Sequence, residues 1–185
     1  ESGEYALQQL PAAQGTLIAL HPADGRIEAV VGGFSFAQSN YNRAVQARRQ
    51  SGSSFKSFLY AAALDGGYTP ASLVNDAPLV FANDHLDNVW RPQNAGGDFL
   101  GPIRLRESLY RSRNLVSIRL MQDLGVDESL TYIERFGFAR EELPRHLSSS
   151  LGSLELTPLQ LTRAYAVFAN GGYLVDPWLI ERIED

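Results

Sequence analysis

Residues 49–65 have the sequence Arg49-Gln50-Ser51-Gly52-Ser53-Ser54-Phe55-Lys56-Ser57-Phe58-Leu59-Tyr60-Ala61-Ala62-Ala63-Leu64-Asp65. From Ser54 onward Ala, Leu and Phe predominate, which predicts a helix that ends at Gly66-Gly67. Ser53 and Lys56 are three residues apart, so a helical backbone would place both side chains on one face. A serine hydroxyl beside an amine suits nucleophilic acyl chemistry if burial or the helix N-terminus lowers the pKa of the lysine. The same spacing also fits a capped helix with a solvated lysine, so the remaining sequence must distinguish the two.

The composition predicts one domain of mixed α/β type with a substantial core, since 44% of the 185 residues are hydrophobic. A net charge of −5 argues against nucleic acid as a partner. No apolar run reaches the roughly 20 residues that cross a bilayer, and no signal peptide opens the chain. The chain has no cysteine, and His21, His85 and His146 are not spaced as ligands, so we predict neither a metal site nor a cofactor.

Apolar periodicity and turn residues predict the secondary structure. Residues 16–20 and 27–31, separated by a loop with Asp24-Gly25, predict a β-hairpin. Helices are predicted at residues 103–110, 115–124, 127–136 and 157–170. Extended segments are predicted at residues 73–81, 173–177 and 178–183.

Two further segments are predicted to be irregular. Residues 1–14 are polar and without periodicity, which predicts a linker. Residues 82–102 are rich in Asn, Asp, Gly and Pro, which predicts a long loop. Trp90 in that loop either lines a binding cleft or fixes the loop to the core.

Between two predicted helices lies the corner Ser112-Arg113-Asn114. Serine and asparagine favour such positions because their side chains bond nearby backbone groups, so the corner alone predicts a helix cap. Taken with Ser53-Ser54-Phe55-Lys56, however, it forms the first two parts of a known signature. Ser-x-x-Lys, a Ser-x-Asn type element and a Lys-Thr-Gly strand together characterise penicillin-binding proteins and class A β-lactamases.

Several longer segments extend this similarity beyond the two short motifs. From about Gly15 to Asp185, the chain resembles the transpeptidase domain of class A, bifunctional penicillin-binding proteins. The segments that carry the resemblance are 42–65, Val89-Trp90-Arg91-Pro92-Gln93-Asn94, 101–114 and 156–172.

The resemblance implies an α/β (α+β) transpeptidase fold, with a central antiparallel sheet flanked by helices, and a peptidoglycan D,D-transpeptidase activity. By position, Ser53 would be the nucleophile that attacks the D-Ala-D-Ala carbonyl, and Lys56 would accept its proton. Ser112 would pass a proton toward the leaving group, and Asn114 would bind the substrate backbone. The implied partners are stem peptides and glycan strands of peptidoglycan, β-lactam antibiotics, and the remainder of a parent chain that is also a glycosyltransferase. The implied location is the periplasmic side of a bacterial inner membrane.

The sequence departs from the family pattern in two ways. Ser51 and Ser57 stand where the family often has proline, outside the catalytic tetrad. More importantly, Lys56 is the only lysine, so these residues contain no Lys-Thr-Gly or Lys-Ser-Gly. We therefore predict that residues 15–185 are the N-terminal part of a transpeptidase domain, and that this segment alone is inactive or slow.

Two alternatives to a transpeptidase remain at this point. The parent protein could hydrolyse its acyl-enzyme, as a D,D-carboxypeptidase or β-lactamase does, although no residue is placed as a base for water. It could also be a non-catalytic β-lactam-binding module in which Ser53 serves only as a trap or a cap.

Overall fold

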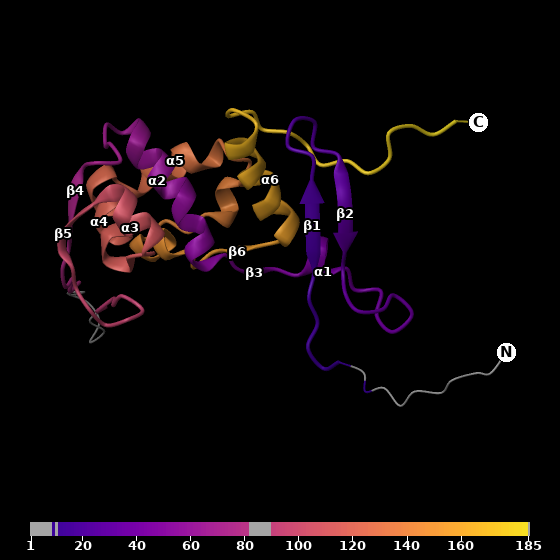
Figure 1. Cartoon of the computed structure of the whole chain (residues 1–185), viewed down its shortest axis with the longest axis horizontal. Helices are drawn as coiled ribbons and strands as arrows, with labels where there is room; N and C mark the ends of the chain where they lie inside the picture. Colours follow the sequence, from indigo (N-terminus) through magenta and orange to yellow (C-terminus); the bar gives the residue numbers. More distant parts are fainter. Residues whose placement is uncertain (1–8, 10, 82–89, 185) are drawn as a thin grey trace. The chain divides into compact units, whose positions relative to one another are not determined.

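The computed structural model describes residue 9, residues 11–81 and residues 90–184 (Figure 1). The chain divides into two compact units, one formed by Arg48–Leu156 and the other by Glu1–Ala47 with Thr157–Asp185. Most of the predicted linker at 1–14, part of the predicted loop at 82–102, and His85 lie outside the described residues.

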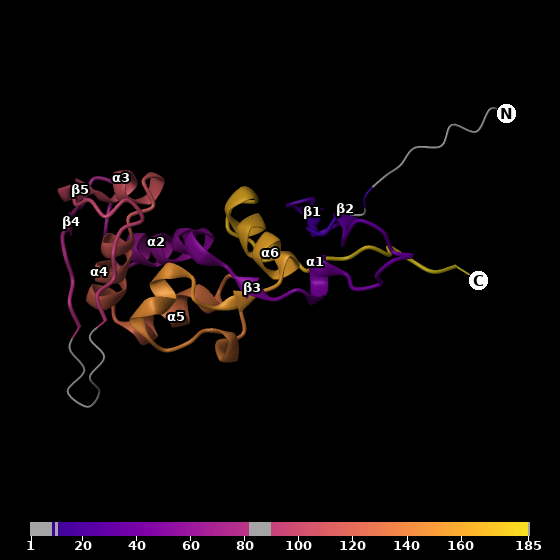
Figure 2. The ribbon, with the colours of Figure 1, turned by 90° about the horizontal axis from the view of Figure 1, so that it is seen from below.

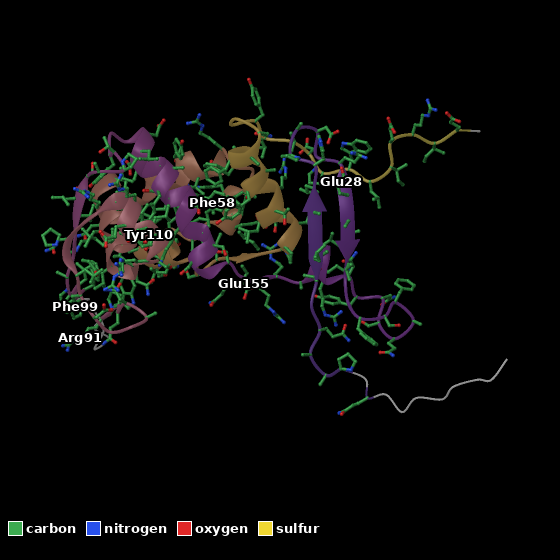
Figure 3. All side chains as sticks on the ribbon, viewed as in Figure 1. Glu28, Phe58, Arg91, Phe99, Tyr110 and Glu155 are labelled. Carbon is green, nitrogen blue, oxygen red and sulfur yellow. The ribbon has the colours of Figure 1, made fainter. Side chains whose placement is uncertain are left out.

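The core of the unit Arg48–Leu156 is built around helix α2, Lys56–Asp65. Helices α4, Asn114–Leu124, and α5, Val126–Glu134, pack against it (Figures 1 and 2). Phe58 is fully buried, and its ring contacts those of Phe136 and Phe138 at centroid distances of 5.0 and 5.1 Å (Figure 3). Burial of these apolar faces is the main term that stabilises the three helices, all of which were predicted from the sequence.

Strands β4, Leu73–Asp76, and β5, Gly101–Arg104, form an antiparallel pair in the same unit. The helix predicted from residue 103 begins only at the next residue after this strand, as α3, Leu105–Tyr110. The predicted start was wrong because Ile103 pairs with Val74 in the ladder and is buried there. The extended segment predicted at 73–81 is likewise a strand only over β4, with an isolated bridge from Phe81 to Trp90.

A pair of two-residue strands and the 3-10 turns beside them support the residues that precede α2. Strand β3, Arg49–Gln50, pairs with β6, Glu155–Leu156. The 3-10 turn η1, Gly52–Phe55, follows β3, and the 3-10 turn η3, Leu147–Leu151, precedes β6. A further 3-10 turn, η2, covers Arg140–Glu142. The backbone N–H of Gly52 donates to the carbonyl of Gly152 at 3.0 Å, and that of Ser51 donates to Leu154 at 3.1 Å. The turn that carries Ser53 is thus fixed by main-chain hydrogen bonds.

Gly152 is irreplaceable in this contact, which gives a first prediction. Its φ is +71°, and a Cβ atom would lie 2.0 Å from the carbonyl oxygen of Gly52. We expect Gly152→Ala to lower the free energy of unfolding by about 3 kcal/mol, since both a left-handed backbone and a backbone clash must be accommodated. Gly97 has the same φ of +71° with nothing within 4 Å of its Cβ position, so Gly97→Ala is the matched control and should cost only about 1 kcal/mol. Equal losses in urea denaturation would contradict the contact.

The unit that combines both ends of the chain contains the predicted hairpin. Strands β1, Leu17–Leu20, and β2, Ile27–Val31, are antiparallel and are joined through a turn with Gly25 at a φ of +81°. A short helix α1, Arg43–Gln46, and helix α6, Pro158–Ala169, complete the unit. Helix α6 begins as predicted, with a capping box between Thr157 and Gln160.

The strands predicted at 173–177 and 178–183 are not formed. Trp178 makes a single parallel bridge to Arg26, and its neighbours have no strand partner among the described residues. Pro177 has no N–H to donate, and Ile183 remains 87% exposed, so neither ladder bonds nor burial stabilise a strand there. Within the described part of the chain, no helix is both long and apolar enough to cross a membrane.

Candidate functional site

The site centres on the amine of Lys56, at the first residue of α2. Its side chain is only 1% exposed. Nζ donates to the Ser112 carbonyl at 2.7 Å, to Ser112 Oγ at 3.0 Å and to Asn114 Oδ1 at 2.6 Å. The structure thus brings together three of the four predicted site residues, from segments more than fifty positions apart.

The three hydrogen-bond partners of the Lys56 amine are all neutral oxygens. Burial removes water without supplying a carboxylate in its place, and lowers the pKa of Lys56 from the ordinary 10.5 to about 8. At pH 7 about a tenth of the amines are then neutral, roughly 300-fold more than for an ordinary lysine. Below about pH 8 the neutral fraction rises tenfold with each pH unit, which is the behaviour required of a base that works near neutrality.

Ser53 lies in the 3-10 turn that leads into α2. The backbone N–H of Lys56 donates to the Ser53 carbonyl, and side chains three residues apart eclipse one another in such a turn. Ser53 is exposed whereas Lys56 is buried, so solvent or a substrate can reach the serine side of the pair.

Ser112 has an unusual backbone conformation, with a φ of +54°, the only non-glycine residue with positive φ in the described part of the chain. A non-glycine residue in this region is strained and is retained where the surroundings require it. Here the conformation lets both the carbonyl and the hydroxyl of Ser112 accept hydrogen bonds from Lys56. The corner is therefore more than the helix cap that its residue types predict, although Asn114 does begin α4.

Trp90, for which the sequence left two roles open, contacts Phe81, and both roles stay predictions. Its ring stacks on that of Phe81 with the two centroids 5.1 Å apart, so the residues on either side of positions 82–89 are in contact. Trp90 and Phe81 also line a hollow of about 420 Å³ together with His146, Leu147 and Ser148.

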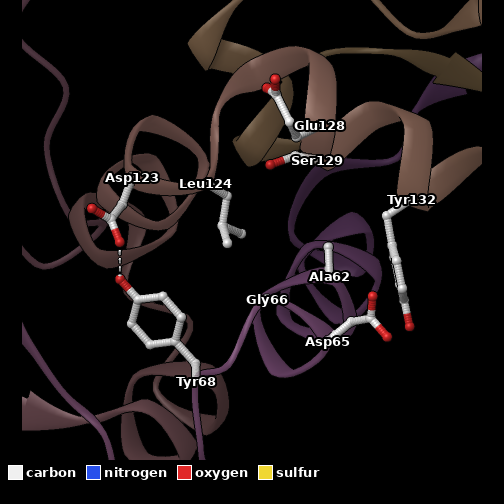
Figure 4. Close-up of a pocket in the computed structure, with 9 residues that line it drawn as sticks. All are labelled: Ala62, Asp65, Gly66, Tyr68, Asp123, Leu124, Glu128, Ser129 and Tyr132. Carbon is white, nitrogen blue, oxygen red and sulfur yellow. Dashed lines mark hydrogen bonds between the residues drawn. The ribbon is translucent and has the colours of Figure 1, made fainter.

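A second hollow of about 420 Å³ lies at the opposite end of α2, beside Asp65 and Gly66 (Figure 4). Tyr68 donates a hydrogen bond to Asp123 there, and burial with this bond raises the pKa of Tyr68 to about 12. The residues that line this hollow include carboxylates but no serine–lysine pair, so we do not assign the acyl chemistry to it. No group of metal-ligating side chains occurs among the described residues.

Comparisons with known proteins agree on one family. The family "Penicillin binding protein transpeptidase domain" matches residues 15–185. Penicillin-binding protein 1A of Pseudomonas aeruginosa is 60% identical over 184 residues, which is 100% of this chain and 22% of that protein. The chain therefore spans about a fifth of the length of such relatives.

Solved structures show the same fold. The crystal structure of penicillin-binding protein 1A from Haemophilus influenzae has a TM-score of 0.93 and 45% identity, and covers 97% of this chain and 27% of that one. An imipenem acyl-enzyme complex of penicillin-binding protein A from M. tuberculosis has a TM-score of 0.76 and 25% identity, over 90% of this chain and 48% of that one. The expected α/β transpeptidase fold is confirmed, and the chain belongs to the penicillin-binding protein transpeptidase family.

Proposed function

We propose that this chain carries the acylation centre of a peptidoglycan D,D-transpeptidase, with Ser53 as nucleophile and Lys56 as its base. The observation that carries the proposal is the Lys56 amine, which is buried, bonded to neutral oxygens of Ser112 and Asn114, and one turn after an exposed serine. Family membership supports the same reaction class.

The proposed reaction begins when neutral Lys56 Nζ accepts the proton of Ser53 Oγ. The oxygen then attacks the carbonyl carbon between the two D-alanines of a stem peptide and forms a tetrahedral intermediate. When the C–N bond breaks, the leaving amine takes a proton that Lys56 passes on through Ser112 Oγ, which lies 3.0 Å from Nζ. The amine of a second stem peptide then attacks the ester, forms the cross-link and returns the proton to Ser53.

The same arrangement explains why Ser112 is a suitable relay. A charged Lys56 can donate to all three oxygen atoms, whereas a neutral amine has two N–H groups and one lone pair. Because a hydroxyl both donates and accepts, Ser112 Oγ can reverse its hydrogen bond when Lys56 changes charge. Asn114 Oδ1 can only accept, and so holds the amine in place. In the proposed complex Asn114 Nδ2, which donates to the Gln93 carbonyl at 2.8 Å, donates to a substrate carbonyl instead.

The partners and location proposed for the whole protein follow from its relatives. A neighbour that forms an imipenem acyl-enzyme supports acylation of Ser53 by β-lactams. Peptidoglycan strands as substrates, a glycosyltransferase elsewhere in the parent chain, and a place on the periplasmic side of the inner membrane are proposed from the family alone. The boundary at residue 15 likewise stays a prediction.

The test is to treat the full-length protein that contains this chain with a fluorescent penicillin and to map the adduct by peptide mass spectrometry. We expect the label on Ser53, and with stem peptides we expect cross-linked products. A label elsewhere would contradict the proposal, and trimmed peptides alone would indicate a hydrolase. Because Lys56 is the only lysine, the 185-residue chain by itself lacks a Lys-Thr-Gly cation and should react slowly.

A further inference from the structure

A buried polar network lies behind the Ser112–Asn114 corner, and its member Asn94 belongs to a segment that carries the family resemblance, although no role in positioning the corner was predicted for it. We infer that Asn94, held by Asp76, is a positioning residue that fixes the backbone of Asn114 and thereby the oxygens that surround Lys56. This inference rests on the proposed function for its catalytic consequence, but its structural part can be tested separately.

Asn94 acts as the N-terminal cap of α4 from a distant loop. It is only 4% exposed, and its Oδ1 accepts hydrogen bonds from the backbone N–H groups of Asn114 at 2.9 Å and Leu115 at 3.3 Å. The helix's own N-cap residue, Arg113, makes no side-chain cap bond. Without Asn94, two N–H groups at this helix end would lose their acceptor, which is costly where water is excluded.

Asp76 fixes the orientation of the Asn94 amide. Asn94 Nδ2 donates to Asp76 Oδ1 at 2.8 Å and to the Asp98 carbonyl at 3.0 Å. A carboxylate and a carbonyl can only accept, so Nδ2 must face them and Oδ1 must face α4. Asp76 is completely buried and also accepts from the backbone of Leu100 at 3.1 Å.

Arg113, the middle residue of the corner, is anchored to the same carboxylate. Its Nε and Nη2 lie 2.7 and 2.6 Å from Asp76 Oδ2, and its side chain is 9% exposed. Arg113 also donates to the side chain and carbonyl of Asp98. The corner is therefore held from behind by Arg113, while Ser112 and Asn114 on either side of it bond to Lys56.

The segment that contains Asn94 also contacts the Asn114 side chain. Asn114 Nδ2 donates to the carbonyl of Gln93, the preceding residue, at 2.8 Å. Residues 93–94 thus hold both the backbone and the amide of Asn114, whose Oδ1 lies 2.6 Å from Lys56 Nζ. A displacement of this segment would be transmitted to the lysine, and a shift of about 1 Å at a reacting group can cost about a hundredfold in rate.

The test compares Asn94→Ala with Ser129→Ala. Ser129 is equally buried in α5 and donates to Gly125 at 2.7 Å, so its variant also removes a buried hydrogen bond, but away from the corner. We expect Asn94→Ala to slow penicillin acylation of the full-length protein by about a hundredfold, and Ser129→Ala to leave the rate within about twofold. In the full-length protein with ¹³Cε-labelled lysine, the signal of Lys56 is the one that disappears in Lys56→Met. Asn94→Ala should move that signal and raise the pKa of Lys56 as water gains access, whereas Ser129→Ala should do neither.

An exchange of the two side chains provides a conservative rescue. Asn94→Asp would place two carboxylates together and should be as slow as Asn94→Ala. Adding Asp76→Asn restores one donor between the two positions, so the double variant should be faster than Asn94→Asp; the recovery stays incomplete because the Asp98 carbonyl loses its donor at position 94 and Arg113 loses its ionic partner. If Asn94→Ala does not fold, the acylation rates of Asn94→Asp and of the double variant with Asp76→Asn test the positioning role instead.

The outcomes separate the two proposals. A folded Asn94→Ala protein that is acylated within about threefold of wild type, or in which the Lys56 signal is unmoved, would overturn the positioning role. If the wild-type protein is not acylated at Ser53, the proposed function fails, and the Lys56 signal still decides whether Asn94 positions the corner.

Discussion

Replacing Ser53 with alanine is expected to abolish covalent labelling by penicillin in the full-length protein that contains this chain. The acyl bond forms to the hydroxyl oxygen of Ser53, which alanine lacks. Removal of the nucleophile from comparable serine sites costs on the order of 10⁴-fold or more. The rate should be measured by stopped-flow or timed quenching with a fluorescent penicillin, followed by separation of the labelled protein.

Ser54→Ala is the matched control for this variant. Ser54 is the next residue, lies in the same 3-10 turn and is also exposed, so the two substitutions perturb the turn alike. We expect Ser54→Ala to be labelled within a few fold of wild type. Labelling of Ser53→Ala at the wild-type rate would show that the acylated residue lies elsewhere.

Replacing Lys56 with methionine is the second large effect. Methionine has a similar length but lacks the amine that accepts a proton, so Ser53 Oγ would lose its base. General bases contribute about 10²–10⁴-fold, and we expect a loss on the order of 10³-fold in the acylation rate constant. We expect the variant to fold, because Met can occupy the buried position of the lysine alkyl chain. Far-UV circular dichroism and thermal unfolding check this.

Lys56→Arg separates a proton acceptor from a fixed positive charge. Arginine remains protonated at every accessible pH, so it can donate to Ser112 and Asn114 but cannot accept the Ser53 proton. We expect Lys56→Arg to be as slow as Lys56→Met. An arginine variant within about tenfold of wild type would mean that charge, and not proton transfer, is what Lys56 supplies.

The sequence was sufficient for the parts of the fold that depend on local pattern. The helix after Ser53, the hairpin turn at Asp24-Gly25 and the helix that follows Thr157 are all local, and all were predicted. The start of α3 was misplaced because the cross-strand pairing of Ile103 outweighed its helical spacing. The apolar pattern near Ile183 predicted a strand, but a strand also needs a partner, which a local pattern cannot supply.

The candidate site shows the same division between local and distant information. Ser53 and Lys56 are linked by spacing, whereas their proximity to Ser112 and Asn114 was inferred from a family resemblance. The spacing could not reveal which oxygens the Lys56 amine is bonded to, nor how deeply it is buried, and burial is what lowers its pKa. Asn94 lies in a segment that carries the family resemblance, but its capping role gave no signal, since a buried capping amide looks like any other loop asparagine in a single sequence.

The most direct test of the account is the titration of Lys56 itself. In the full-length protein with ¹³Cε-labelled lysine, the Lys56 signal is identified by its loss in Lys56→Met and can be followed by NMR from pH 6 to pH 11. The account predicts a midpoint at about pH 8, set by burial of an amine whose partners are neutral. A midpoint near the ordinary 10.5 would mean that Lys56 is solvated and protonated at neutral pH, and it would contradict its role as the base for Ser53.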